Sequence, residues 1–272
     1  MQLEHWQLAE SPFSTLLDTR HYYPSASHDE ALARLEYLVD ARRRLGALVG
    51  ESGIGKSLVL RVAADRLAHR SAAVATIDVA GAGTREFLWQ LAAALGAAPR
   101  DSVDAVQLWR QIADRLAENR LQQKSTLLMV DNAGEAGPDV LTQIARLARL
   151  ESSPDARWTI VLAAAPAEAA RWNESLREQV DLRVDLEPWD EAETIGYIQT
   201  ALVDAGRCDP VFLEEALLAI YALTHGVPRR VVRLAELALI AGAAAGVERI
   251  DAETVHAASS DMSWPTLETM AY

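Results

Sequence analysis

The chain has 272 residues, of which 50% are hydrophobic and 24% charged, enough for one large domain or one medium and one small domain. This composition excludes a largely disordered protein, and the net charge of −13 disfavours an extended nucleic-acid footprint. The single cysteine, Cys208, excludes an intramolecular disulfide framework. Because neither a secretory signal nor an apolar stretch long enough to span a bilayer is present, we expect a cytoplasmic protein without a transmembrane segment.

Residues 1–30 carry aromatic and turn residues without a helical or strand period, which predicts a structured arm. The apolar spacing over 31–39 predicts a helix, with Ser27 or Asp29 as its cap. We expect His28 to serve packing or capping, because no metal-ligand spacing surrounds it.

A strand, a glycine-rich turn and a helix follow one another between residues 45 and 69. Residues 45–49 form a short apolar run typical of a buried strand, and 50–57 (GESGIGKS) fit G-x-x-x-x-G-K-[ST] at every fixed position. Residues 58–69 have the apolar spacing of an amphipathic helix. This context makes the motif a credible phosphate-binding loop.

The residue types of this loop suit a nucleoside triphosphate. Its glycines allow successive N–H groups to converge on an anion, and the helix that opens at Lys56 adds the positive end of its dipole. We expect Lys56 to reach the β- and γ-phosphates and the Ser57 hydroxyl to bind Mg²⁺. The expected nucleotide-binding residues are Gly50, Glu51, Ser52, Gly53, Ile54, Gly55, Lys56, Ser57 and Leu58.

Further strands and helices alternate along the chain up to residue 187. Strands are predicted at 73–79, 126–130, 158–164 and 182–186, and helices around 87–95 and over 106–121 and 138–150. Such alternation predicts an α/β fold in which a five-stranded parallel sheet is covered on both faces. Asp131 ends the strand at 126–130, where these folds place a carboxylate that holds Mg²⁺, usually through water.

From Pro188 onward the pattern predicts helices and no strand of useful length. Asp190 is expected to cap a helix through Leu202, Pro210 to open another, and Asp251 to cap the last. The expected organisation is an N-terminal arm (1–30), a nucleotide-binding domain (31–187), a small all-helical lid domain (188–260) and a tail (261–272). Two basic clusters, Arg42–Arg44 and Arg229, Arg230 with Arg233, are expected beside the nucleotide.

The chain resembles the AAA+ ATPases, a family of P-loop NTPases, and within them the ExeA/GspA branch of general secretion ATPases, near the TniB and TnsC transposition ATPases. The residues that carry this resemblance are Trp6–Leu8, Pro12-Phe13, Asp18, Arg20, Tyr23, His28–Leu32, Gly50–Ser57, Leu127–Asp131, Leu186–Pro188 and Gly226–Arg229. The resemblance implies a bilobed ATPase that binds ATP and Mg²⁺ and works as an oligomer. It implies that Arg229 is the second sensor of the γ-phosphate, and that Arg177 or Arg183 is a finger arginine for a neighbouring subunit.

Two departures from the family pattern concern hydrolysis. The family has Asp-Glu-Ala after the third strand, whereas this chain has Asp131-Asn132-Ala133, and an amide cannot take a proton from water. The polar first sensor is replaced by Ala163-Ala164-Ala165-Pro166. We therefore expect ATP binding with slow hydrolysis, unless Glu135 substitutes for the missing glutamate.

Three functions remain open at this point. The first is an ATP-gated switch that acts with an unidentified protein partner in assembly of a secretion or envelope system. The second is an active oligomeric motor whose site is completed by Glu135 or by a neighbouring subunit. The third is an ATP-dependent DNA-associated adaptor of the transposition type, which the acidic charge disfavours.

Overall fold

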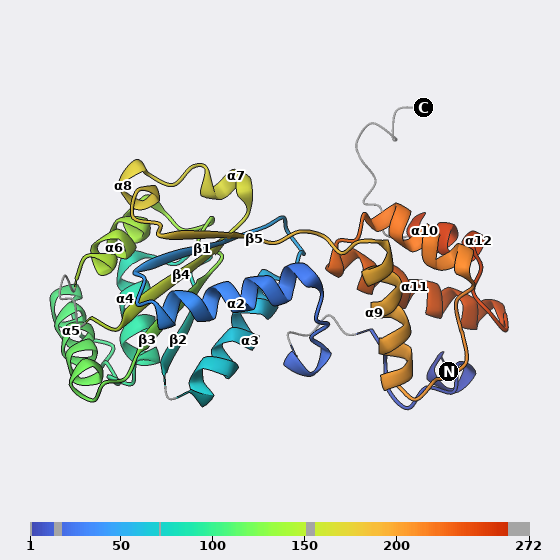
Figure 1. Cartoon of the computed structure of the whole chain (residues 1–272), viewed down its shortest axis with the longest axis horizontal. Helices are drawn as coiled ribbons and strands as arrows, with labels where there is room; N and C mark the ends of the chain where they lie inside the picture. Colours follow the sequence, from blue (N-terminus) through green and yellow to red (C-terminus); the bar gives the residue numbers. More distant parts are fainter. Residues whose placement is uncertain (1, 14–17, 71, 151–155, 261–272) are drawn as a thin grey trace. The chain divides into compact units, whose positions relative to one another are not determined.

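The computed structural model describes residues 2–13, 18–70, 72–150 and 156–260. They divide into two compact units (Figure 1). One unit spans Ala26–Glu187, and the other combines the described parts of 1–25 with those of 188–272. The described residues among the first 25 therefore pack with the C-terminal helices, and α2 of the first unit already begins at Ala26, inside the segment expected to be arm.

The unit 26–187 is built on a parallel sheet of five strands, which confirms the predicted fold class. The strands are β1 (Leu45–Val49), β2 (Ala73–Asp78), β3 (Thr126–Asp131), β4 (Trp158–Ala164) and β5 (Leu182–Asp185). Their order is β2-β3-β4-β1-β5, and every pair is parallel. All carboxyl ends therefore meet at one edge of the sheet, where such folds bind their ligands.

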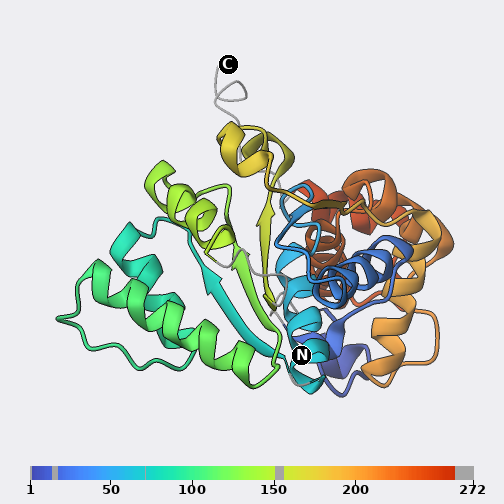
Figure 2. The same ribbon diagram turned by 60° about the vertical axis from the view of Figure 1, so that its left-hand side comes forward.

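Helices cover the sheet (Figure 2). The long ones are α2 (Ala26–Asp40), α3 (Lys56–His69), α4 (Thr84–Ala94), α5 (Ala105–Leu121) and α6 (Pro138–Ala148). Two short helices, α7 (Pro166–Ala169) and α8 (Glu174–Arg177), were not predicted, because four residues are too few for a periodic pattern. The expected caps of α2 are wrong: Ser27 and Asp29 lie inside its first turn, and the Ser27 hydroxyl accepts the N–H of Glu187 at 2.9 Å.

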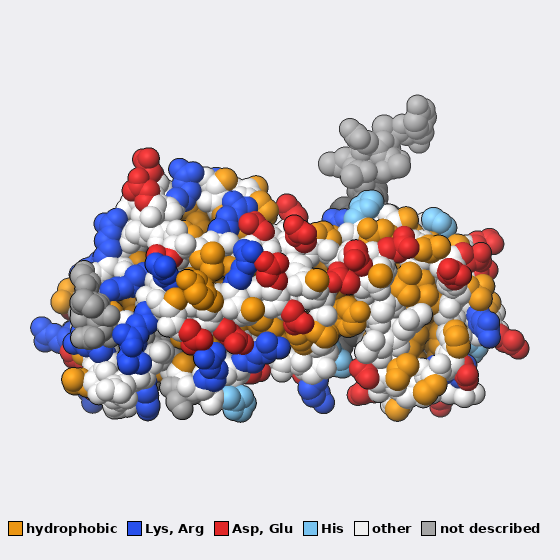
Figure 3. All heavy atoms as spheres, in the orientation of Figure 1, with side chains coloured by type: hydrophobic (Ala, Val, Ile, Leu, Met, Phe, Trp, Pro, Cys, Tyr) orange, Lys and Arg blue, Asp and Glu red, His pale blue; other side chains and the backbone are white. Residues whose placement is uncertain are grey.

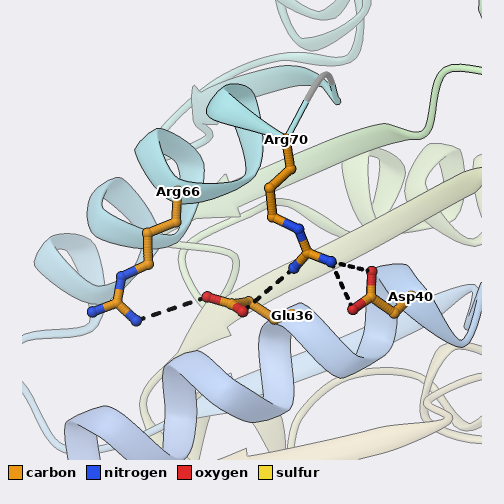
Figure 4. Close-up of polar contacts among 4 residues, drawn as sticks. All are labelled: Glu36, Asp40, Arg66 and Arg70. Carbon is orange, nitrogen blue, oxygen red and sulfur yellow. Dashed lines mark hydrogen bonds and ion pairs between the residues drawn. The ribbon is translucent and has the colours of Figure 1, made fainter.

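Ion pairs join α2 to α3 along their exposed sides (Figure 4). Arg70 donates to both carboxylate oxygens of Asp40 at 2.9 Å and lies 3.4 Å from Glu36, whose other oxygen is 3.7 Å from Arg66. The Asp40 carboxylate raises the pKa of the Arg70 guanidinium. Half-exposed pairs add little stability singly, so this group links α2 to the helix that follows the phosphate-binding loop without contributing much to the stability of the unit.

The second unit contains α1 (Gln2–His5), a 3-10 turn η1 (Thr19–His21), α9 (Glu191–Asp204), α10 (Glu214–Thr224), α11 (Pro228–Ala245) and α12 (Ala252–Ser260). Trp6 and Phe13, each 1% exposed, belong to the hydrophobic core of this unit. The indole N–H of Trp6 donates to the Leu239 carbonyl at 2.9 Å. Because its apolar side chains supply part of this core, the N-terminal segment is an integral part of the helical unit.

Most helix boundaries of this unit follow the predicted signals. Asp190 and Asp251 cap α9 and α12 as expected, accepting the N–H groups of Glu193 and Thr254 at 2.7 and 2.9 Å. The prediction for Pro210 is wrong, since α10 begins only at Glu214. Residues 211–213 instead form a bridge with Ile250, in which the Leu213 N–H donates to the Ile250 carbonyl at 2.8 Å. The predicted tail, 261–272, lies outside the described residues.

The Asp-x-Arg segment of the family resemblance forms a local turn in the same unit. Asp18 accepts the backbone N–H of Arg20 at 2.9 Å and its guanidinium at 2.6 Å, and this pair lowers the pKa of the Asp18 carboxyl to about 2. Tyr23 packs edge-on against Trp189 and Tyr197.

Within the described part of the chain, no helix is both long and apolar enough to cross a membrane.

Candidate nucleotide-binding site

The phosphate-binding loop joins β1 to α3 at the carboxyl edge of the sheet. The Gly50 N–H donates to the Ala164 carbonyl at 3.2 Å, which ties the start of the loop to the end of β4. Gly53 and Gly55 have φ angles of +84° and +105°, conformations that other residues adopt only at a cost. Gly55 is also the residue before α3, so no side chain caps the first N–H groups of the helix. They are oriented to bind an anion.

The charged and hydroxyl groups of the loop fit the triphosphate and Mg²⁺ expected from the sequence. The Lys56 ammonium lies over the loop, where it donates to the Gly50 and Glu51 carbonyls at 2.7 and 3.0 Å. Ser57 follows in the first turn of α3. Its hydroxyl and the Asp131 carboxylate at the end of β3 are oxygen donors of the kind that Mg²⁺ prefers.

A buried histidine supports the loop from behind, a role that the sequence analysis missed. His28 lies in α2 and is 3% exposed, and its Nε2 is 2.9 Å from the Ile54 carbonyl oxygen. A Cβ atom on Gly55 would be 2.7 Å from the same nitrogen, so the ring also requires glycine there. The Ile54 C=O and the Gly55 N–H belong to the same trans peptide and point in opposite directions. The hydrogen bond from His28 to the Ile54 carbonyl therefore turns the Gly55 N–H away from His28. His28 thereby orients one of the N–H groups that we expect to bind phosphate.

Replacing His28 by alanine is expected to weaken ATP binding about fivefold, because a net hydrogen bond contributes about 1 kcal/mol. Fluorescence titration with a methylanthraniloyl ATP measures the dissociation constant. His28→Gln retains an N–H donor and should recover most of the affinity. The control is Leu35→Ala, a buried position of the same helix far from the loop, which should lower the melting temperature without changing the dissociation constant. Equal affinities for wild type and His28→Ala would contradict this role.

Asp131 and Asn132 lie where β3 ends beside β2. Asp78, the last residue of β2, is the register partner of Asp131. Asn132 has a left-handed φ of +53°, and its backbone N–H donates to the Asp131 carboxylate at 2.9 Å. Its side-chain nitrogen donates to Asp78 Oδ1 at 3.0 Å. Asp78 was not singled out from the sequence, because its place beside Asn132 depends on the strand order.

A carboxylate from α7 lies near the alanines of the first-sensor position. Glu168, in α7, folds back so that its Oε2 accepts the Ala165 N–H at 2.9 Å. Its side chain packs against Gly134 so closely that no Cβ atom would fit on that glycine.

Glu135, the predicted substitute for the missing glutamate, is exposed. Its backbone N–H closes a turn by donating to the Asn132 carbonyl at 2.9 Å.

The expectation that Arg42–Arg44 flank the nucleotide is wrong. These arginines precede β1, whereas the phosphate-binding loop follows it, so the whole strand separates them and they lie at the opposite edge of the sheet. There the backbone N–H of Arg44 donates to the Asp181 carboxylate at 2.8 Å. Closeness in sequence therefore does not mean closeness in space here.

The predicted finger and sensor arginines are all exposed. Arg177 ends α8, and Arg183 in β5 donates to the Asp185 carboxylate at 2.6 Å. Arg229 lies in the first turn of α11, in the unit of the C-terminal helices, as do Arg230 and Arg233. Their roles toward a nucleotide remain predictions.

Known proteins are similar to this chain over the residues that form the loop. Residues 39–172, which include the loop and the end of β3, match the sequence family described as AAA domain. The chain is also 28% identical over 254 residues to General secretion pathway protein A of Aeromonas hydrophila, covering 92% of this chain. The chain therefore contains an AAA domain. Both its AAA+ character and its likeness to the ExeA/GspA branch are thereby confirmed.

Solved structures show the same fold. Cdc6p from Pyrobaculum aerophilum superposes with a TM-score of 0.72 at 19% identity, over 95% of this chain and 72% of that one. The Aeropyrum pernix Orc1 protein, solved in complex with DNA, gives a TM-score of 0.66 at 17% identity, over 93% of this chain and 71% of that one. RuvB of Thermotoga maritima, a Holliday junction branch migration motor, gives a TM-score of 0.59 at 15% identity, over 88% of this chain and 70% of that one. This AAA+ chain spans less than half, 46%, of the length of its secretion relative.

Proposed function

We propose that this AAA+ protein binds ATP with Mg²⁺, hydrolyses it slowly and uses the bound state as a switch. The observation that carries the proposal is Asn132, an amide held directly after Asp131 at the end of β3, where the family has glutamate. An amide orders a water molecule through hydrogen bonds but cannot accept its proton at neutral pH. Loss of a positioned general base lowers a rate about 10²–10⁴-fold. Binding is retained and turnover is slow.

The binding groups have distinct roles in this proposal. The N–H groups of the loop and the first turn of α3 hold the phosphates, and the Lys56 ammonium neutralises their charge. Ser57 and Asp131 would hold the metal ion, which when bound would supply charge stabilisation to the transferring phosphoryl group. Arg229 approaches the γ-phosphate as a second sensor, and Arg177 or Arg183 serves a neighbouring copy as a finger.

The switch acts through assembly. ATP promotes self-association and creates a surface for a protein partner in a secretion or envelope system. The likeness to General secretion pathway protein A supports this setting, although the chain spans less than half of that relative. A slow ATPase keeps the ATP-bound form long enough for a partner to act on it.

Equilibrium binding and size-exclusion chromatography with light scattering test the proposal together. Titration with methylanthraniloyl ATP and Mg²⁺ should show saturable binding that unlabelled ATP displaces. The mass of the eluting species should increase with ATP and Mg²⁺ over that with ADP. No displaceable binding at millimolar ATP would refute nucleotide binding, and an unchanged mass would refute ATP-dependent assembly.

The uneven distribution of charge supports a second candidate, an ATP-dependent DNA-associated adaptor. Residues 26–187 contain 20 Lys and Arg and 23 Asp and Glu, which gives a net charge of −3. The remaining residues contain 6 Lys and Arg and 16 Asp and Glu, which gives a net charge of −10. Figure 3 shows many Lys and Arg side chains on one face of the unit 26–187. The acidic excess therefore does not prevent this unit from approaching phosphates. DNA binding that requires ATP and weakens steeply with salt would favour this function over the switch.

A further inference from the structure

Basic residues precede three neighbouring strands at the amino edge of the sheet, opposite the phosphate-binding loop. Arg42 and Arg43 come before β1, Lys124 before β3 and Arg157 before β4. The strand order places β4 between β3 and β1, and neighbouring strands lie about 4.8 Å apart, so these four residues form one short row. We call this row the basic edge.

Hydrogen bonds fix the backbone along the basic edge. On one side of β4, the Thr126 N–H donates to the Arg157 carbonyl at 2.6 Å. On the other side, the Thr159 hydroxyl donates to the Arg43 carbonyl at 2.8 Å. Segments far apart in the sequence are thereby held side by side. Figure 1 shows β1 beginning at the left-hand end of this unit, and Figure 3, in the same orientation, shows many Lys and Arg side chains at that end.

The cations of the basic edge form a local positive surface. Three of the four side chains are exposed, and that of Arg157 is half-buried. Among the described residues, the only ion pair of the four is that of Arg43 with Asp181 at 4.0 Å. The segments that lead into the three strands carry six cations and two carboxylates, a net charge of +4 in a chain of −13; they are residues 41–44, 120–125 and 151–157.

An exposed apolar side chain lies beside these cations. Leu121, the last residue of α5, is 81% exposed, more than any other large hydrophobic residue of the described chain. The turn after it is compact, because the Lys124 N–H donates to the Asn119 carbonyl at 2.9 Å, so Leu121 lies at the same edge of the sheet as Lys124. Tyr37, 53% exposed, lies in the last turn of α2, which leads to Arg42.

This combination matches the chemistry of a bilayer surface. Lys and Arg side chains attract anionic lipid headgroups, while leucine and tyrosine side chains enter the interface between headgroups and acyl chains. A nucleic-acid backbone would use the same cations but would leave Leu121 in water. Only a bilayer uses both kinds of side chain.

We propose that the basic edge, together with Leu121, binds the surface of a lipid bilayer that carries anionic headgroups. This inference goes beyond the nucleotide switch and does not depend on it. Because the phosphate-binding loop lies at the carboxyl edge of the sheet, contact of the amino edge with lipid leaves the loop open to ATP.

Flotation of the whole chain with lipid vesicles tests the contribution of the cations. The protein should bind vesicles of equal parts phosphatidylglycerol and phosphatidylcholine, and not vesicles of phosphatidylcholine alone. Arg42→Gln, Lys124→Gln and Arg157→Gln should each lower the partition coefficient about fivefold, which corresponds to about 1 kcal/mol for each cation near an anionic surface. The matched control is Arg171→Gln, an exposed arginine after α7, beyond the carboxyl end of β4, which should leave binding unchanged.

A variant of Leu121 distinguishes lipid from other polyanions. Leu121→Ala should lower partition into the mixed vesicles about tenfold, because less apolar surface enters the interface. The matched control is Val106→Ala, since Val106 is 72% exposed and lies near the other end of α5. The two residues are about 22 Å apart along the helix, so this control should bind vesicles as the wild type does. Because the substituted side chains are exposed or half-buried, the melting temperature should not change in any variant.

Three results would overturn the inference: no flotation with the mixed vesicles, equal loss of binding in the control variants, or full binding by Leu121→Ala. A parallel titration with duplex DNA decides between the two polyanions. If DNA bound with lower affinity in the three cation variants while vesicles did not bind, the basic edge would be a nucleic-acid surface and the lipid inference would be refuted.

Discussion

Replacing Asn132 by glutamate is expected to raise the rate of single-turnover ATP hydrolysis about 10²–10⁴-fold, the usual contribution of a positioned general base. The position is suitable because Asn132 directly follows Asp131 at the carboxyl edge of the sheet. The rate is measured with protein in excess over labelled ATP. Asn132→Gln lengthens the side chain without adding a base and should give no comparable gain.

Asp78 influences the size of this gain. A glutamate at position 132 would bring a second carboxylate close to the oxygen that the Asn132 amide now contacts at 3.0 Å, and like charges disfavour each other. We therefore expect Asn132→Glu with Asp78→Asn to hydrolyse ATP faster than Asn132→Glu alone. If neither variant exceeds the wild-type rate, the missing glutamate does not limit hydrolysis and the active-motor interpretation is favoured.

Replacing Lys56 by alanine is expected to weaken ATP binding at least about 100-fold, because a charge-assisted contact to phosphate contributes about 1.5–3 kcal/mol and we expect the lysine to contact two phosphates. Its ammonium already lies over the loop, 2.7 Å from the Gly50 carbonyl oxygen. The dissociation constant for methylanthraniloyl ATP is again the measurement.

The chain offers an unusually clean control for this variant, since Lys56 and Lys124 are its only lysines. Lys124 is exposed and precedes β3, at the opposite edge of the sheet from the loop. Lys124→Ala should therefore leave the dissociation constant unchanged. Equal loss of affinity in both variants would indicate a general charge effect and contradict the specific role of Lys56.

The parts of the site that depend on local sequence were predictable. The loop over 50–57 follows from glycines that must adopt positive φ beside a lysine and a serine, and Asp131 follows from an apolar strand that ends in a carboxylate. The five parallel strands follow from the alternation of strand and helix patterns, because each crossover needs a helix.

The contacts that support the site required the tertiary structure. His28 precedes Ile54 by 26 residues, and Asp78 precedes Asn132 by 54, so no local period relates either pair. The strand order puts β2 beside β3, and this order cannot be deduced from the spacing of apolar residues. The same limitation explains the wrong expectation for Arg42–Arg44, which are near the loop in sequence but across the sheet from it.

The measurement that tests the account most directly is a single-turnover assay with excess protein, labelled ATP and Mg²⁺, in which ATP and ADP are followed over hours. We predict that ATP stays bound and largely intact over this time in the wild type, and that Asn132→Glu converts it to ADP much sooner. Formation of ADP within minutes in the wild type would contradict the slow-ATPase switch and establish this AAA+ protein as a working ATPase.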